Sequence, residues 1–86
     1  DLAGVAMADQ KDVTEEVTRL ASHLDEYALA LRSQEEVGRR LEFLIQEMLR
    51  EANTIGSKSA DVTVSRLTVD LKVELDRLKE QVQNVE

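Results

Sequence analysis

The stretch GRRLEFLIQEMLREANTIGSKSAD, residues 38–61, decides the fold that we expect of this chain. Its apolar residues Leu41, Leu44, Met48 and Ile55 follow one another at steps of three, four and seven. On a helix with about 3.6 residues per turn, these steps place all of them on one stripe. A neighbouring polar stripe consists of Arg40, Glu47, Glu51, Thr54 and Lys58. The stretch therefore predicts an amphipathic helix that buries one stripe and carries charge along its edge.

The preceding segment, residues 12–32, predicts a first helix. Its apolar stripe consists of Val13, Val17, Leu20, Leu24 and Leu31, and its adjacent polar stripe consists of Asp12, Glu16, Arg19, His23 and Tyr27. Asp12 and Glu15 have the spacing of a capping box, which would begin the helix there. Because residues 2–11 continue the helical spacing, we favour a longer helix that extends back to Leu2.

Polar residues mark both ends of the second helix, which we predict over residues 34–55. Ser33 and Glu36 have the spacing of a capping box at its start. At its end, Gly56 is suited to the left-handed position that follows a helix.

We predict a third helix over residues 59–85, capped by Ser57 or Ser59 and with Asp61 in its first turn. As an alternative, the N–H groups, hydroxyls and Lys58 of this turn contact phosphate. The apolar seam of the third helix consists of Val64, Leu67, Leu71, Leu75, Leu78, Val82 and Val85. This spacing is typical of a coiled coil in the second half of the helix.

These patterns predict an all-α fold of three long helices, in which a helical hairpin is joined by a coiled-coil-like third helix. The chain has no proline to interrupt them. We expect a single domain over residues 1–86. The residues expected to be buried are Leu24, Leu41, Leu44, Met48, Leu71, Leu75 and Leu78. Because this aliphatic core is thin, we expect it to pack against another domain or another copy.

The composition narrows the classes of function. The net charge is −7, which opposes general nucleic-acid binding because phosphate contacts need clustered lysine and arginine. The chain has no cysteine, so disulfides and thiolate metal sites are excluded. No apolar run approaches the length of a membrane span, and no signal peptide is visible. We therefore expect a cytoplasmic protein that has no membrane contact and no evident small-molecule cofactor.

Long strings in the sequence carry a family resemblance. GRRLEFLIQEMLREANTIGSKSAD, SRLTVDLKVELDRLKEQVQNVE and DVTEEVTRLASH resemble the C-terminal domain of the YicC/YloC-like family. REANTIGSKS and KEQVQN are the most specific parts of the match, whereas Leu49 departs from the asparagine that is usual in the family. The resemblance implies a bacterial cytoplasmic endoribonuclease that is metal-dependent, oligomeric and longer than this chain.

Within these strings, side-chain chemistry suggests roles for individual residues. We expect His23, Glu47 and Arg50 to be catalytic, since histidine suits proton transfer at neutral pH. Arg19, Arg40 and Lys58 are expected to contact RNA phosphates. Divalent Mn or Mg is expected on carboxylates, with the ligands drawn from Glu16, Glu47, Glu51 and Asp61. In an antiparallel hairpin, the polar edges of the first two helices would flank one site.

Each of these residues also has a structural interpretation. Charges at this spacing commonly form ion pairs on a helix surface, and a lone histidine near an apolar stripe is usually a packing residue. Two functions therefore follow from the sequence. One is an endoribonuclease domain that acts on RNA in the full-length protein. The other is a non-catalytic helical domain that assembles a homo-oligomer.

Overall fold

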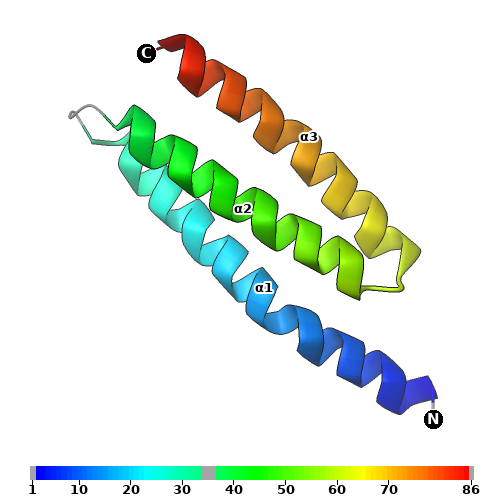
Figure 1. The fold of residues 1–86 in the computed structure, drawn as a ribbon. Helices are drawn as coiled ribbons and strands as arrows, with labels where there is room; N and C mark the ends of the chain where they lie inside the picture. The colour runs from blue at the N-terminus through cyan, green and yellow to red at the C-terminus, as the bar shows by residue number, and fades with distance from the viewer. Residues whose placement is uncertain (1, 34–36, 86) are drawn as a thin grey trace.

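The computed structural model describes the backbone of residues 2–33 and 37–85, and the side chains of residues 13–33 and 37–84. It contains α1 (Leu2–Leu31), α2 (Gly38–Lys58) and α3 (Val62–Val85), and no strand among the described residues. The predicted all-α fold of three long helices is confirmed (Figure 1). None of the described helices is both long enough and apolar enough to span a bilayer.

The helix starts differ in part from the sequence prediction. Because α1 begins at Leu2, the longer first helix is confirmed and the capping box at Asp12 does not start a helix. The second capping box falls on residues 34–36, which lie outside the described part. The residue before α2 is Val37, which makes no side-chain capping hydrogen bond.

The turn between α2 and α3 uses other residues than we predicted. Gly56 lies inside α2 and no glycine has a positive φ, so the left-handed position predicted for it is wrong. The helix instead ends at Lys58 and is capped by Ser59, whose extended backbone donates its N–H to Ile55 O at 3.0 Å. Asp61 precedes α3 and its Oδ1 accepts the N–H of Val64 at 3.1 Å, which makes it the N-terminal cap. Ser59 Oγ accepts the N–H of Asp61 and so supports the cap from the turn.

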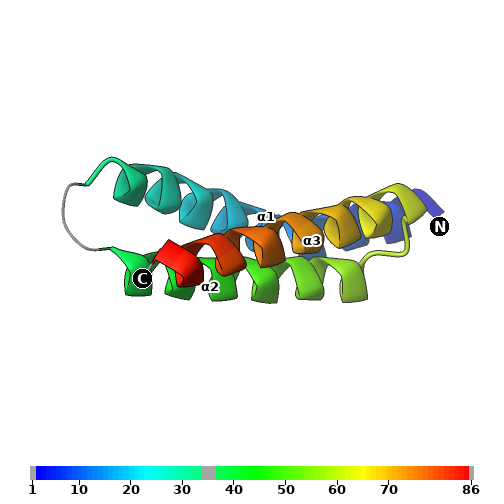
Figure 2. The same cartoon turned by 90° about the horizontal axis from the view of Figure 1, so that it is seen from above.

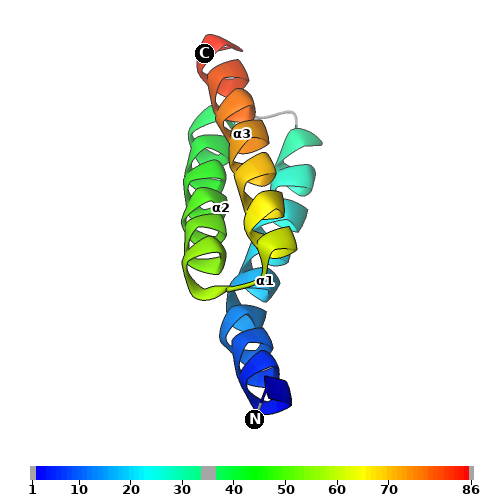
Figure 3. The same cartoon turned by 90° about the vertical axis from the view of Figure 1, so that its right-hand side faces the viewer.

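The second helix is the centre of the arrangement. It packs against both α1 and α3, whereas α1 and α3 do not pack against each other within the described chain. Consecutive helices run antiparallel, with α2 between the other two in Figure 1. Figures 2 and 3 show that α1 and α3 nevertheless lie on the same side of α2. The molecule is elongated, with extents of 52 × 19 × 14 Å.

The core follows from this central position of α2. Leu44, Ile45 and Met48 are the largest fully buried side chains. From α1 the core receives Tyr27 and Ala30, and from α3 it receives Leu75 and Val82. Of the residues predicted to be buried, Leu41, Leu44, Met48 and Leu75 are confirmed, and Leu71 and Leu78 are half-buried against the core.

The rotation of α1 about its axis differs from the prediction. Leu24 is 55% exposed, and Val17 and Leu31 are exposed as well, so these members of the predicted apolar stripe do not face α2, whereas Leu20 packs against the core. The face toward α2 carries Glu16, Leu20, His23, Tyr27 and Ala30, which follow one another at steps of three and four. Two stripes of helical spacing lie side by side on α1, and the one that carries polar groups is the one that packs.

The central stripe of α2 makes a direct prediction about stability. Leu44→Ala removes buried methyl groups and leaves a cavity, so the free energy of unfolding should fall by about 2–5 kcal/mol. Phe43→Ala at the exposed neighbouring position should change it by less than about 0.5 kcal/mol. Urea unfolding followed by circular dichroism measures both values. Equal effects of the two substitutions would show that α2 is rotated relative to the structure.

Candidate functional site

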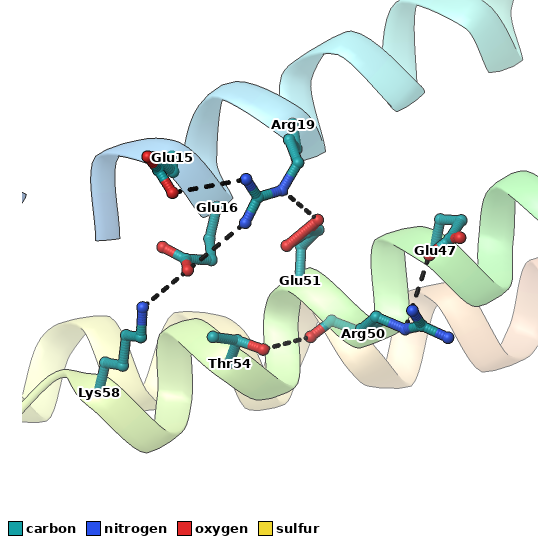
Figure 4. A network of polar contacts seen from close by, with 8 residues as sticks. All are labelled: Glu15, Glu16, Arg19, Glu47, Arg50, Glu51, Thr54 and Lys58. Carbon is teal, nitrogen blue, oxygen red and sulfur yellow. Dashed lines mark hydrogen bonds and ion pairs between the residues drawn. The ribbon is translucent and has the colours of Figure 1, made fainter. Parts of the chain in front are cut away.

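Charged side chains connect α1 to α2 along one edge of their interface (Figure 4). Arg19 Nε donates to Glu51 Oε2 at 2.8 Å, and its guanidinium also lies 3.5 Å from Glu16 Oε1. Lys58 Nζ donates to the same Glu16 oxygen at 2.9 Å. We call Glu16, Arg19, Glu51 and Lys58 the ion-pair edge. It joins residues that are far apart in the sequence and therefore sets the register of the hairpin.

The two carboxylates of the ion-pair edge are buried. Glu16 is only 3% exposed, and its second oxygen, Oε2, is buried without a hydrogen-bond partner among the described residues. The hydrogen bond from Lys58 holds the pKa of Glu16 below its usual value, although burial alone would raise it. The hydrogen bond to Glu51 likewise raises the pKa of Arg19. Glu16 and Arg19 therefore stay charged at neutral pH.

Further along the same edge, Arg40 Nη2 donates to Glu26 Oε2 at 3.3 Å. His23 lies on α1 between Arg19 and Glu26, and its Nδ1 is buried without a hydrogen-bond partner in the described part. Because His23 lies between Arg19 and Glu26, it is level with the segment of α2 between Arg40 and Glu51. These contacts confirm that the polar edges of the first two helices meet, whereas the expectation that they flank one functional site stays a prediction.

This edge differs from a preformed metal centre. Across the described residues, no group of three or more His, Cys, Asp or Glu side chains converges as metal ligands would. Arg19 lies against Glu16 and Glu51, and Lys58 lies against Glu16 from the other side. The unpartnered Glu16 Oε2 is one donor atom, whereas divalent cations need several oxygen ligands. Glu16 and Glu51 are therefore engaged by cationic side chains in this arrangement.

A polar groove of about 540 Å³ runs between α2 and α3, away from the ion-pair edge. The groove is lined by Gln46, Leu49, Arg50, Asn53, Thr54, Lys72 and Asp76. A second hollow of about 220 Å³ adjoins it, since Asn53 and Lys72 line both. The second hollow also reaches Gly56, where a Cβ atom would lie 3.1 Å from Thr68 Oγ1. Gly56 therefore serves the close approach of α3.

The predicted site residues are thus divided among three places. Glu16, Arg19, Glu51 and Lys58 form the ion-pair edge, and Arg40 pairs with Glu26 further along the hairpin. His23 and Glu47 lie between these contacts in the sequences of α1 and α2. Arg50 lines the groove and lies 3.7 Å from Glu47, so it connects the edge to the groove. Asp61 lies apart from both and caps α3.

Two groove residues, Lys72 and Asp76, were missed as site residues from the sequence. Each directly follows a seam leucine, Leu71 or Leu75. Residues in that position lie at the border of the packed face, and this signal could have placed them in a groove. The sequence did not reveal which border faces α2.

Comparisons with known proteins agree with this architecture. The family described as "Endoribonuclease YicC-like, C-terminal" matches residues 3–86. A protein of Clostridioides difficile named "Probable endoribonuclease YicC" is 46% identical over 79 residues. A protein of Haemophilus influenzae with the same name is 40% identical over 82 residues. These matches cover 92% and 95% of this chain.

The all-helical hairpin with its attached third helix is thus the C-terminal domain type of a family of endoribonucleases. The chain belongs to the YicC-like C-terminal family. It spans only 27% and 29% of the length of the two curated relatives.

The buried carboxylate of Glu16 predicts a pH dependence of stability. Its folded-state pKa lies below the ordinary value of 4.5, so its contribution is fully present above pH 4.5. The contribution is lost as the pH falls from 4.5 through the lower folded-state pKa, because the unfolded chain takes up the proton first. Glu16→Gln should therefore lower stability at neutral pH and flatten the decline below pH 4.5.

Glu15→Gln is the matched control, since the Glu15 side chain is 80% exposed and lies 3.7 Å from the same Arg19. It should leave both stability and its acid dependence close to those of the unsubstituted chain. Urea unfolding at several pH values compares the two variants. Parallel acid profiles for Glu16→Gln and the unsubstituted chain would contradict the assigned role of Glu16.

Proposed function

We propose that this chain is the RNA-contacting C-terminal domain of a longer, metal-dependent endoribonuclease. Support comes from the family to which the chain belongs and from the names of its two relatives. Since the chain spans less than a third of those relatives, we assign cleavage to the longer protein. The cytoplasmic location and the homo-oligomer expected from the resemblance are parts of the same proposal.

The proposal for RNA contact rests on the groove between α2 and α3. Arg50 and Lys72 supply two cations from different helices, and Asn53 and Gln46 add amide groups between them. Charged and amide side chains of this kind make most protein contacts to phosphate and sugar. Arg50 and Asn53 also belong to the string REANTIGSKS that carries the resemblance. We therefore propose that this groove holds the RNA backbone.

The distribution of charge makes this role compatible with a net charge of −7. Glu16 and Glu51 are paired with Arg19 and Lys58 at the ion-pair edge, so much of their charge is neutralised locally. The groove itself is lined by two cations and one carboxylate, Asp76, and Glu47 pairs with Arg50 at its border, so its charge is close to balanced. A local field of this kind governs the approach of an anionic ligand more than the net charge does.

For metal dependence, we propose a cation that the RNA helps to bind. Mg²⁺ is usually held by one or two carboxylates together with substrate phosphates and water. Glu47 is the carboxylate that we assign to it, because Glu47 is partly exposed and lies beside Arg50, which lines the groove. A bound cation would supply charge neutralisation at the phosphate and an acidified water. His23, on the facing edge of α1, is proposed to carry a proton.

A second function is favoured by a separate observation. Val17, Leu24, Leu31 and Leu67 are exposed leucine and valine side chains on α1 and α3. Exposed apolar side chains that gather on one stripe, as Val17, Leu24 and Leu31 do on α1, are typical of contact with other protein segments. We therefore keep a second, non-catalytic role for the domain, in which this apolar surface contacts another protein segment, and the two roles use different faces.

RNA contact is tested by removing the two groove cations in the full-length protein. Arg50→Gln combined with Lys72→Gln should weaken binding of a structured RNA at least tenfold, or about 1.4 kcal/mol. The slope of affinity against salt should fall by roughly 1–2 units as phosphate contacts are lost. Arg66→Gln, an exposed substitution of the same charge on α3, is the control. Unchanged binding by a folded double variant would place the RNA elsewhere.

The catalytic assignment has a separate test in the full-length protein. His23→Ala or Glu47→Gln should lower RNA cleavage at least tenfold, about 1.4 kcal/mol of barrier, while RNA binding is retained. Glu47→Gln should in addition raise the Mn²⁺ concentration needed for half-maximal cleavage. Glu80→Gln on the exposed face of α3 controls for the loss of one carboxylate. Full activity of both variants would leave this domain with the binding and assembly roles.

A further inference from the structure

An uncovered apolar edge runs along α1. Val17, Leu24 and Leu31 are spaced seven residues apart and are 49%, 55% and 60% exposed. Ala21 and Ala28 lie between them on the same stripe and are also exposed. Leu20, which packs against the core, adjoins this stripe, so the exposed edge continues the buried face of α1. Steps of four and three along a single stripe are the spacing of a helix–helix seam.

A matching edge lies on α3. Leu67 is 60% exposed, and it precedes half-buried Leu71 by one helical turn. Leu78 is likewise only partly covered by the core. Lys72 and Asp76 lie at the opposite border of the packed face of α3, where they line the groove with α2. The uncovered leucine edge therefore faces away from that groove.

The two apolar edges lie on the same side of the molecule. On α1, the charged residues that pair with α2 occupy one border of the packed face, and Leu24 occupies the other. Figures 2 and 3 place α1 and α3 together on one side of α2, although α1 and α3 do not pack against each other. We call Val17, Leu24, Leu31 and Leu67 the open apolar face.

We propose that the open apolar face is the seat of an amphipathic helix from the part of the longer protein that lies outside this domain. The two curated relatives carry more than two thirds of their length outside the region that this chain matches. A segment of the same polypeptide reaches this face at a high effective concentration. It would lay an apolar stripe between α1 and α3 in the manner of a helix in a hydrophobic site.

The charges beside the open apolar face specify the occupant further. Asp25 follows Leu24 on α1 and Asp70 precedes Leu71 on α3, whereas Glu74 is already paired with Arg77 at 2.9 Å. A helix with lysine or arginine beside its apolar stripe complements these carboxylates. A second copy of this acidic chain, whose net charge is also −7, would bring like charge to the same face. The net charge therefore disfavours a second copy on this face, and Asp25 and Asp70 suit a helix that carries basic residues.

Cysteine labelling of the full-length protein tests whether a helix binds the open apolar face. The domain has no cysteine, so a single Leu24→Cys or Leu67→Cys substitution places one thiol on the open apolar face. Leu29→Cys is the matched control, because Leu29 is 65% exposed on α1 but lies outside the stripe. The maleimide reaction at each position is followed by mass spectrometry of the peptide that contains it, at two protein concentrations.

The expected result is labelling at positions 24 and 67 that is slower than at position 29 by on the order of tenfold or more, independent of protein concentration. A photo-crosslinker attached at position 24 should capture a peptide from outside this domain that belongs to the same polypeptide. Equally fast labelling at all positions would show that the face is open and would overturn the proposal. Protection that disappears on dilution, or capture of a peptide from another copy, would assign the face to self-association and would also overturn it.

Discussion

The burial of Glu16 is the constraint from which much of the arrangement follows. A buried carboxylate is costly unless it is paired, and Lys58 and Arg19 are the cations that reach it. Lys58 lies at the end of α2, so the pairing sets both the register of the hairpin and the rotation of α1. Once α1 is rotated in this way, Tyr27 and Ala30 enter the core and Leu24 turns outward. Ion pairs of this kind specify an arrangement more than they add to its stability, and we infer that role here.

This constraint explains what could and could not be read from the sequence. The spacing of Glu16 and Arg19 on one helix, and of Glu51 and Lys58 on the next, was enough to predict that the two polar edges meet. Hydrophobicity alone pointed to Val17 and Leu24 as the packed stripe of α1, and that was wrong. Two stripes with the same helical period compete on α1, and periodicity has no information on the pairing energy that decides between them.

The turn between α2 and α3 shows a different limit of the sequence. A glycine followed by serines near a helix end is the usual signal for a left-handed cap, and Gly56 has that signal. Its actual role depends on Thr68 of the neighbouring helix, which approaches to within contact distance of where a side chain would begin. That contact is made between two helices, so the residues next to Gly56 in the sequence do not indicate it. Asp61 is the opposite case. Its side chain suggested a metal ligand, but its carboxylate accepts the N–H of Val64 and caps α3.

The string REANTIGSKS contributes residues both to the ion-pair edge and to the groove. Glu51 and Lys58 point from α2 toward α1, where they complete the ion-pair edge. Arg50 and Asn53, at other angles on the same turns, line the groove with α3. A change that disturbs the edge would therefore rotate α2 and displace the groove as well, since a helix turns as a rigid unit. For this reason, loss of RNA cleavage in an edge variant is informative about catalysis only where the fold and the groove are shown to be intact.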